Sequence, residues 1–412
     1  MRRIVTVAFL TILVSFFVFP VGFTFLPDSL NSKMILAGTG ILFFIYDLLK
    51  DRTVRLSHTT LISGFIALIF SAWCLFSTTA NGTTDNTYVT YWRSFATWML
   101  GAYAVYFLLR QHSGKVDLCT LTRFLAIVCV CQCVLALLID NISGIKRFVD
   151  SIFVGGEYFS RYLRLYGIGC ALDPAGCRFS VVQVMIAHQI ATNKDVRNST
   201  KSLLQFLLAF IAITVIGSMI SRTTMVGSAL GLGFIVISVF RLRKGGFITK
   251  DQFRLFLVFF LLITTAIMVT VGVYRASSVF RSYLRFGFEG FFTWAETGEF
   301  HTGSTDTLMQ LMWIWPSDPR TWMIGSGRIG VFEWGTDIGY CNFVLYCGLI
   351  GLVIYSGYFI YNHLSLNGKY NNFFITSLLL IALTFIIWAK VTTDIFFIDA
   401  LLFCIDGDKQ NE

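Results

Sequence analysis

Charged residues are scarce in this chain of 412 residues. Asp, Glu, Lys and Arg make up only 13% of it, whereas hydrophobic residues make up 56%. A soluble domain typically carries about 25% charged residues. The composition therefore excludes an ordinary soluble domain and suits a lipid bilayer. We expect one polytopic membrane domain that spans residues 1–412.

The sequence also lacks the spacings that hold metals. Its ten cysteines are scattered without a CxxC pair, and most lie in apolar runs as small hydrophobic residues. We expect no metal site and no cofactor. Cys170 and Cys177 can form a disulfide in an oxidising compartment or remain two thiols, and the sequence does not separate these alternatives.

The net charge of +9 does not indicate nucleic-acid binding. The basic residues sit in short clusters between apolar runs, as the positive-inside rule describes for membrane proteins. Their distribution places the N-terminus inside. Arg2 and Arg3 before the first apolar run resemble a signal sequence, but Pro20 and the lack of a small-residue cleavage site favour an uncleaved helix.

Apolar runs recur along the whole chain, and a membrane helix needs about 20 such residues. The sequence predicts an all-α polytopic membrane protein with about 11 or 12 transmembrane helices and a long periplasmic loop at 275–337. A twelfth span at 395–405 is short and contains Asp399, so a re-entrant or interfacial helix fits it equally well. The other expected spans are 4–26, 34–49, 59–78, 93–109, 118–140, 177–190, 202–220, 223–242, 254–274, 338–361 and 372–389.

Two outside connections, 141–176 and 275–337, break the positive-inside pattern because they carry arginines. Long translocated loops tolerate charge, so a solvated surface is the simplest interpretation. Both loops are also rich in aromatic residues and glycine. Arginine next to aromatics is suited to bind phosphate and sugar together, which favours a function for some of these residues.

Three stretches can carry chemistry, and the first is RLYGIGCALDPAGCRFS, residues 164–180. Pro174 is typical of a helix start. Arg164 and Arg178 lie close to that start, where free amide groups and the helix dipole favour an anion. The alternative is an ordinary turn into a membrane helix.

The second stretch is SMISRTTMVGS, residues 218–228. Its centre, 221–224, predicts a tight external hairpin that holds Arg222 near the membrane interface. A charge costs about 2.5–3.5 kcal/mol at the bilayer centre and less near its edge. Snorkelling explains such a residue, but the neighbouring hydroxyls favour a phosphate ligand.

The third stretch lies in 301–352. Its amphipathic centre around Trp313 predicts a helix that lies flat on the bilayer or caps a cavity. The glycine-rich IGSGRIG turn lacks the strand and lysine of a nucleotide loop. Asp337 precedes a membrane helix, where it can cap the helix or accept a proton from a sugar hydroxyl. His301 is a weaker candidate for that base.

In this order, the three stretches resemble the O-antigen polymerase and O-antigen ligase superfamily of Wzy-type membrane glycosyltransferases. The resemblance covers roughly the C-terminal two-thirds of the chain. It rests on an Arg-x-x-Gly element before a proline, a Ser-Arg hairpin, a Gly-x-Gly turn and a helix with two glycines. The matching residues are Arg164, Gly167, Pro174, Ser221, Arg222, Gly325, Gly327, Gly348 and Gly351.

Two departures from the family pattern matter. Ligases usually place a His-Asn pair where this chain has Thr336 and Asp337, which favours a polymerase. Many members also have an arginine shortly after a loop serine, which is absent after Ser304. The second external arginine must then come from elsewhere in the loop, and the candidates are Arg281, Arg285 and Arg328.

The resemblance implies a polymerase of O-antigen, capsular or exopolysaccharide at the periplasmic face of a bacterial inner membrane. Its implied partners are an undecaprenyl diphosphate-linked oligosaccharide, membrane lipid and a chain-length regulator protein. Arg222 and Asp337 would be catalytic. The implied substrate-binding residues are Arg164, Arg178, Arg281, Arg285 and Arg328. A ligase that transfers glycan to lipid A core and a polysaccharide flippase are the alternatives.

Overall fold

The computed structural model describes residues 2–51, 57–159, 161, 164–241 and 250–409, and within them the secondary structure is helical with no β-sheet. The chain forms two compact units, each described here by itself. Unit 1 comprises Met1–Ser32 and His112–Gly298, and unit 2 comprises Lys33–Gln111 and Glu299–Glu412.

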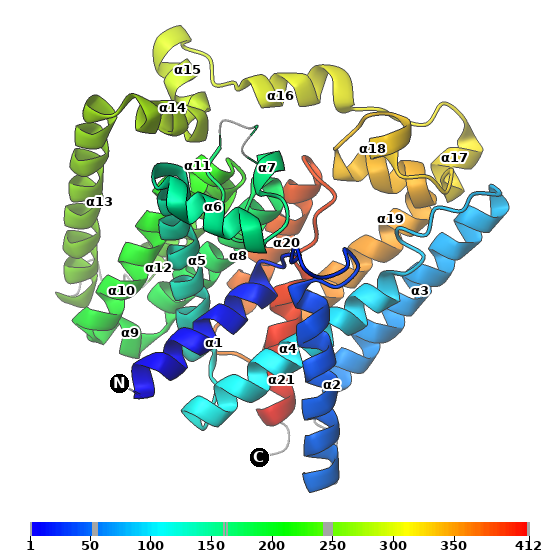
Figure 1. Ribbon diagram of the computed structural model, residues 1–412, viewed down its shortest axis with the longest axis horizontal. Coiled ribbons are helices and arrows are strands. Elements are labelled where there is room, and N and C mark those ends of the chain that lie inside the picture. The colour runs from blue at the N-terminus through cyan, green and yellow to red at the C-terminus, as the bar shows by residue number, and fades with distance from the viewer. Residues whose placement is uncertain (1, 52–56, 160, 162–163, 242–249, 410–412) are drawn as a thin grey trace. The chain divides into compact units, whose positions relative to one another are not determined.

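Unit 1 is built around a buried helix, α8, which packs against α5 and α12 (Figure 1). Helices α8 and α12 cross closely because glycines face the partner: a Cβ added at Gly227 would lie 2.2 Å from the Cα of Ser180. Small residues allow this approach in membrane helices. The helices of unit 1 are α1 (Arg2–Val18), α5 (Leu118–Asn141), α6 (Ser143–Ile152), α7 (Gly156–Phe159), α8 (Leu172–Thr192), α9 (Lys194–Asn198), α10 (Thr200–Ala212), α11 (Ser218–Ile220), α12 (Thr224–Arg241), α13 (Lys250–Ala276), α14 (Ser278–Gly287) and α15 (Glu289–Thr297), with a π-helical turn, Ile213–Gly217, between α10 and α11.

Unit 2 is centred on α19, which packs against α3, α17 and α20. Tyr355 of α19 stacks on Phe70 of α3 with ring centroids 4.4 Å apart, and on Trp388 at 5.2 Å. The helices of unit 2 are α2 (Ser32–Asp51), α3 (His58–Ala80), α4 (Tyr91–Ser113), α16 (Gly303–Thr307), α17 (Pro319–Ile324), α18 (Gly330–Glu333), α19 (Gly339–Ser365), α20 (Phe374–Trp388) and α21 (Phe396–Lys409), with a π-helical turn, Leu308–Met312, after α16.

Helix α19 is broken at Gly348, whose φ of 69° is left-handed. The break leaves carbonyl groups without helical partners, and such groups are costly in an apolar environment. Other segments satisfy them. Ser77 donates to the carbonyl of Tyr346 at 2.9 Å, and Trp73 donates to that of Cys347 at 2.8 Å. The break is therefore a defined feature of the fold.

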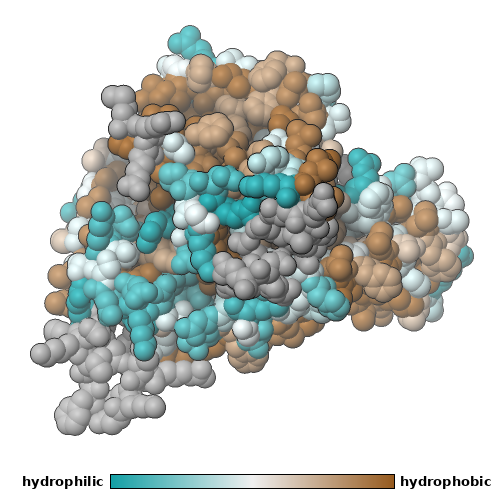
Figure 2. Space-filling model, turned by 90° about the horizontal axis from the view of Figure 1, so that it is seen from below, coloured by the Kyte–Doolittle hydropathy of each residue, from teal (hydrophilic) through white to brown (hydrophobic). Residues whose placement is uncertain are grey.

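Six helices are long and apolar enough to cross a membrane within the described residues, so the chain is a multi-pass membrane protein. The face in Figure 2 shows apolar side chains at the surface beside groups of polar ones. Each expected span overlaps a helix, with residue 242 of the span 223–242 outside the described residues, but the count of 11 or 12 spans stays an expectation. The six are Ser32–Lys50, His58–Ala80, Leu118–Asn141, Thr200–Ile220, Leu257–Ala276 and Gly339–Ser365.

The first helix is shorter than the sequence predicts. It ends at Val18 rather than near residue 26, because Pro20 has no N–H to donate and its ring obstructs the preceding turn. The chain then turns back, and Gly22 forms a bridge with Asn31.

Candidate functional site

The turn that carries Arg222 is held against the start of α8. Asp173, in the first turn of α8, accepts hydrogen bonds from the Ser221 hydroxyl at 3.0 Å and the Thr223 hydroxyl at 2.8 Å. Gly176 lets the two segments touch, since a Cβ there would lie 2.5 Å from Ser221 Oγ. The tight turn expected from the sequence is therefore confirmed, with α11 ending at Ile220 and α12 beginning at Thr224.

Arg164 and Arg222 meet on one aromatic ring. The Cζ atom of Arg222 lies 4.3 Å, and that of Arg164 4.7 Å, from the centroid of Phe286 on α14. A backbone hydrogen bond of 3.2 Å from Leu165 to Met219 joins the segment of Arg164 to α11. Such cation–π contacts contribute about 0.5–1 kcal/mol at exposed sites. Two cations from separate parts of unit 1 are thus brought together.

Acidic residues balance this pair of cations. Arg222 Nη1 lies 2.5 Å from Glu289 Oε2, an ion pair by distance whose N–H direction does not fit a hydrogen bond. Burial lowers the pKa of Arg222, the Glu289 carboxylate opposes that shift, and the Arg164 charge adds to it. With Asp173 close by, the two guanidinium charges meet two carboxylates. An anionic ligand would have to displace Glu289 from Arg222.

Arg178, also expected at this site, forms a hydrogen bond within its own helix, α8. Its Nη1 donates to the carbonyl of Pro174 at 3.0 Å. Cys170 is a buried thiol outside any disulfide, so it is not bonded to Cys177, which is buried too. The two-thiol alternative therefore describes this segment.

The two arginines of α14 point to other partners. Arg281 lies over the ring of Tyr274, with its Cζ 5.2 Å from the centroid. Arg285 forms an ion pair of 2.7 Å with Glu296, and that hydrogen bond raises the pKa of Arg285. Helix α14 therefore contributes Phe286 to the site, and neither of its arginines lies on that ring.

The remaining two expected site residues belong to unit 2. Arg328 forms an ion pair of 2.8 Å with Glu333, and both side chains are about half exposed. Asp337 is exposed just before α19. It does not cap that helix, because the N-cap residue is Ile338, where no side-chain capping bond is made.

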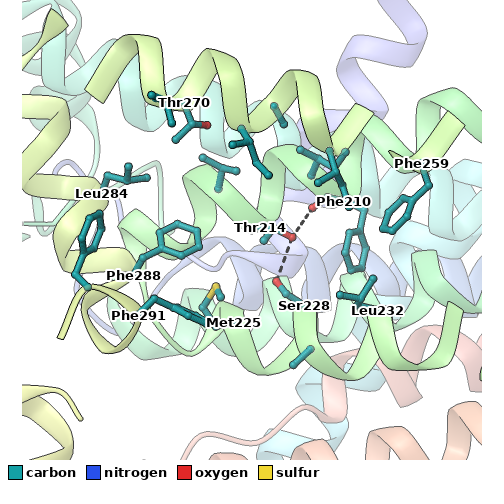
Figure 3. Close-up of a pocket in the computed structure, with 18 of the residues that line it drawn as sticks. Phe210, Thr214, Met225, Ser228, Leu232, Phe259, Thr270, Leu284, Phe288 and Phe291 are labelled. Atoms are coloured by element: carbon teal, nitrogen blue, oxygen red, sulfur yellow. Dashed lines mark hydrogen bonds between the residues drawn. The ribbon is translucent and has the colours of Figure 1, made fainter. Parts of the chain in front are cut away.

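Unit 1 also contains an apolar cavity of about 640 Å³ (Figure 3). Its walls come from α10, α12, α13 and the corner between α14 and α15. Leu284 and Phe288 of that corner flank Phe286 in sequence. Two of the hydroxyls in Figure 3 are bonded: Ser228 Oγ donates to Thr214 Oγ1 at 3.1 Å, and Thr214 donates to the Phe210 carbonyl at 2.8 Å. The cavity thus offers a hydrocarbon surface in the same unit as the two guanidinium groups.

Sequence reasoning missed Phe286, Glu289 and the role of Asp173. Phe286 is one of 42 phenylalanines, so nothing in its residue type singles it out. Asp173 stands directly before Pro174, and nothing else in the sequence marks it as a partner of the hairpin hydroxyls. Glu289 follows Arg285 by four residues, a spacing that would have paired it with Arg285 rather than with Arg222, so the sequence held no signal for this contact.

Among the residues that the structure describes, no group of three or more His, Cys, Asp and Glu side chains is placed to hold a metal ion. Comparison with known proteins found no protein-family model that matches the chain, and no curated protein or solved structure with detectable similarity.

Proposed function

We propose that this chain is a membrane glycosyltransferase that polymerises a polysaccharide from undecaprenyl diphosphate-linked repeat units. The observation that carries the proposal is the meeting of Arg164 and Arg222 on Phe286, in a unit that also holds an apolar cavity. A lipid diphosphate combines an anionic head with a long hydrocarbon tail, and this pair of surfaces suits both parts.

In the proposed reaction, an acceptor hydroxyl attacks the anomeric carbon of the donor glycan. The bond between that carbon and the diphosphate oxygen breaks, and the negative charge that develops on the diphosphate is stabilised by Arg222 and Arg164. Glu289 releases Arg222 when the diphosphate binds. The hydroxyl must also lose its proton to a base, and no residue of unit 1 is assigned to that role.

The test is incubation of purified protein with a synthetic diphosphate-linked repeat unit, followed by separation of products by length. Wild-type protein should give a ladder, and Arg222→Ala should give none while remaining folded in the membrane. Arg147→Ala is the matched control, because Arg147 is exposed on α6. A wild-type ladder from Arg222→Ala would refute the assignment. Transfer to a lipid A core acceptor without a ladder would identify a ligase instead.

A transporter is the second candidate, and the break of α19 at Gly348 favours it. Transporters often build their substrate sites from broken helices with freed backbone groups. In this chain the freed carbonyls are occupied by Trp73 and Ser77, which makes the break less available to a substrate. Movement of lipid-linked glycan across vesicles without a new glycosidic bond would support this candidate.

A further inference from the structure

Several ionisable residues lie in the interior of unit 2, although burial of an ionisable side chain costs more free energy than burial of an apolar one. The first is Asp394, which lies in a polar pocket of about 380 Å³ with Lys33, Thr87 and Arg93. The hydroxyls of Tyr91 and Tyr355 reach Asp394 Oδ2 at 3.4 and 3.5 Å. The pocket therefore gives water access to a carboxylate next to buried tyrosines.

A second carboxylate is fully buried. Asp399 of α21 lies with its Oδ1 2.9 Å from Nδ1 of His363 on α19, and both side chains are 0% exposed. The other ring nitrogen of His363 lies 3.3 Å from the Thr384 hydroxyl of α20. An ionisable pair at this depth is costly to retain, and in membrane proteins such residues mark ion pathways and proton relays.

One oxygen of this pair is left without a partner. In the described part of the chain, Asp399 Oδ2 is buried and makes no hydrogen bond. Native interiors contain few such groups. Tyr358 lies on α19 between Tyr355, whose hydroxyl reaches Asp394, and His363, which pairs with Asp399, and its ring stacks on that of Tyr355 with centroids 6.3 Å apart.

A third carboxylate lies further along α21. Asp406 is seven residues beyond Asp399, so it falls on the same helix face about 10 Å away along the axis. It forms an ion pair with Lys369, whose Nζ lies 3.1 Å from the hydroxyl of Thr59 near the start of α3. Because Tyr355 packs on Phe70, in the middle of α3, this ion pair lies nearer the start of α3 than the Asp394 pocket does.

We propose that unit 2 conducts protons along the row formed by Asp394, Asp399 and Asp406, with His363 and Asp399 as the buried proton-binding site. Helices α19 and α21, which carry this pair, are labelled in Figure 1. A proton enters at Asp394, passes the hydroxyls of Tyr355 and Tyr358 to the pair, and leaves toward Asp406. A pH difference or membrane potential drives the movement, so no other reactant is consumed. The inference does not depend on glycosyl transfer.

The experiment uses the full chain in liposomes that contain a pH-sensitive dye, with an imposed pH difference and potassium with valinomycin to clamp the potential. Wild-type protein should change the internal pH faster than protein-free liposomes do. Asp399→Asn and His363→Gln should each reduce the rate to the protein-free value. Asp306→Asn is the matched control, because Asp306 pairs with His301 at 3.0 Å in the same unit but is 42% exposed.

A purely structural pair predicts a different result. Wild-type protein would then match protein-free liposomes, which would overturn the proposal whatever the variants do. Wild-type rates in a folded Asp399→Asn variant would overturn it as well. Asp399→Glu, which keeps a carboxyl group, should conserve part of the flux. Infrared difference spectra should show a protonated carboxyl group that titrates in wild-type protein and is absent from Asp399→Asn.

Discussion

Arg222 and Glu289 face each other at 2.5 Å across unit 1, one from the turn before α12 and the other from the first turn of α15. This ion pair has two effects. It neutralises a half-buried guanidinium group, and it occupies the place that an anionic ligand would take. Ligand binding at Arg222 must therefore compete with an internal carboxylate.

This competition predicts that Glu289→Gln strengthens binding of a polyprenyl diphosphate. The pair is partly exposed, so its loss should be worth about 1 kcal/mol or less, and the affinity should rise a few-fold. The measurement is a binding titration of purified protein. Glu296→Gln is the control, because Glu296 pairs with exposed Arg285 instead. Equal effects of the two substitutions would argue against a site at Arg222.

Phe286 is expected to hold both arginines in place. Phe286→Leu removes two cation–π contacts of about 0.5–1 kcal/mol each, so diphosphate binding should weaken several-fold. Phe286→Tyr keeps a ring and should retain most of the affinity. The same titration checks both variants. Unchanged affinity in the leucine variant would show that the ring of Phe286 does not contribute to diphosphate binding.

The break in α19 is expected to be intolerant of a side chain. Gly348→Ala would place a Cβ 2.2 Å from the carbonyl oxygen of Met323, at a φ of 69°. The left-handed backbone alone costs about 1–3 kcal/mol for another residue, so thermal stability should fall clearly. Gly357→Ala is the control in the same helix, because nothing lies within 4 Å of the added atom. It should preserve or raise stability, since alanine favours a helix by about 1 kcal/mol.

The α17 helix should loosen in acid. Hydrogen bonds from Thr321 lower the pKa of Asp318, which caps the start of this helix. A lowered folded-state pKa means that the carboxylate stabilises the helix above its ordinary pKa. That contribution is lost as the pH falls through the lowered value. Hydrogen exchange of α17 amides should therefore accelerate in acid for wild-type protein, and Asp318→Asn should flatten this dependence.

Much of the helical layout could be predicted from the sequence, because apolar runs of membrane length leave few alternatives. Each expected span overlaps a helix, although α1 is shorter than its span, and the tight turn at Arg222 lies where the hairpin was expected. The early end of α1 follows from Pro20, because a proline shortly after Val18 prevents the helix from continuing. These features depend on local composition alone.

The contacts of the site could not be predicted in the same way. The partners of Arg222 are Phe286 and Glu289, which lie more than 60 residues away along the chain. The pairing of His363 with Asp399 likewise joins two helices separated by α20. Such pairs depend on how helices rotate and cross, and a single sequence does not encode that in its periodicity.

The glycine-faced crossing of α8 and α12 also has a mechanical consequence. Gly227 lies against the backbone of Ser180, and Gly176 lies against the side chains of Ser221 and Thr223, so that a larger residue at either position would push these segments apart. The turn that carries Arg222 is therefore held in register with α8, whereas Glu289 reaches the same guanidinium from a separate element, the first turn of α15.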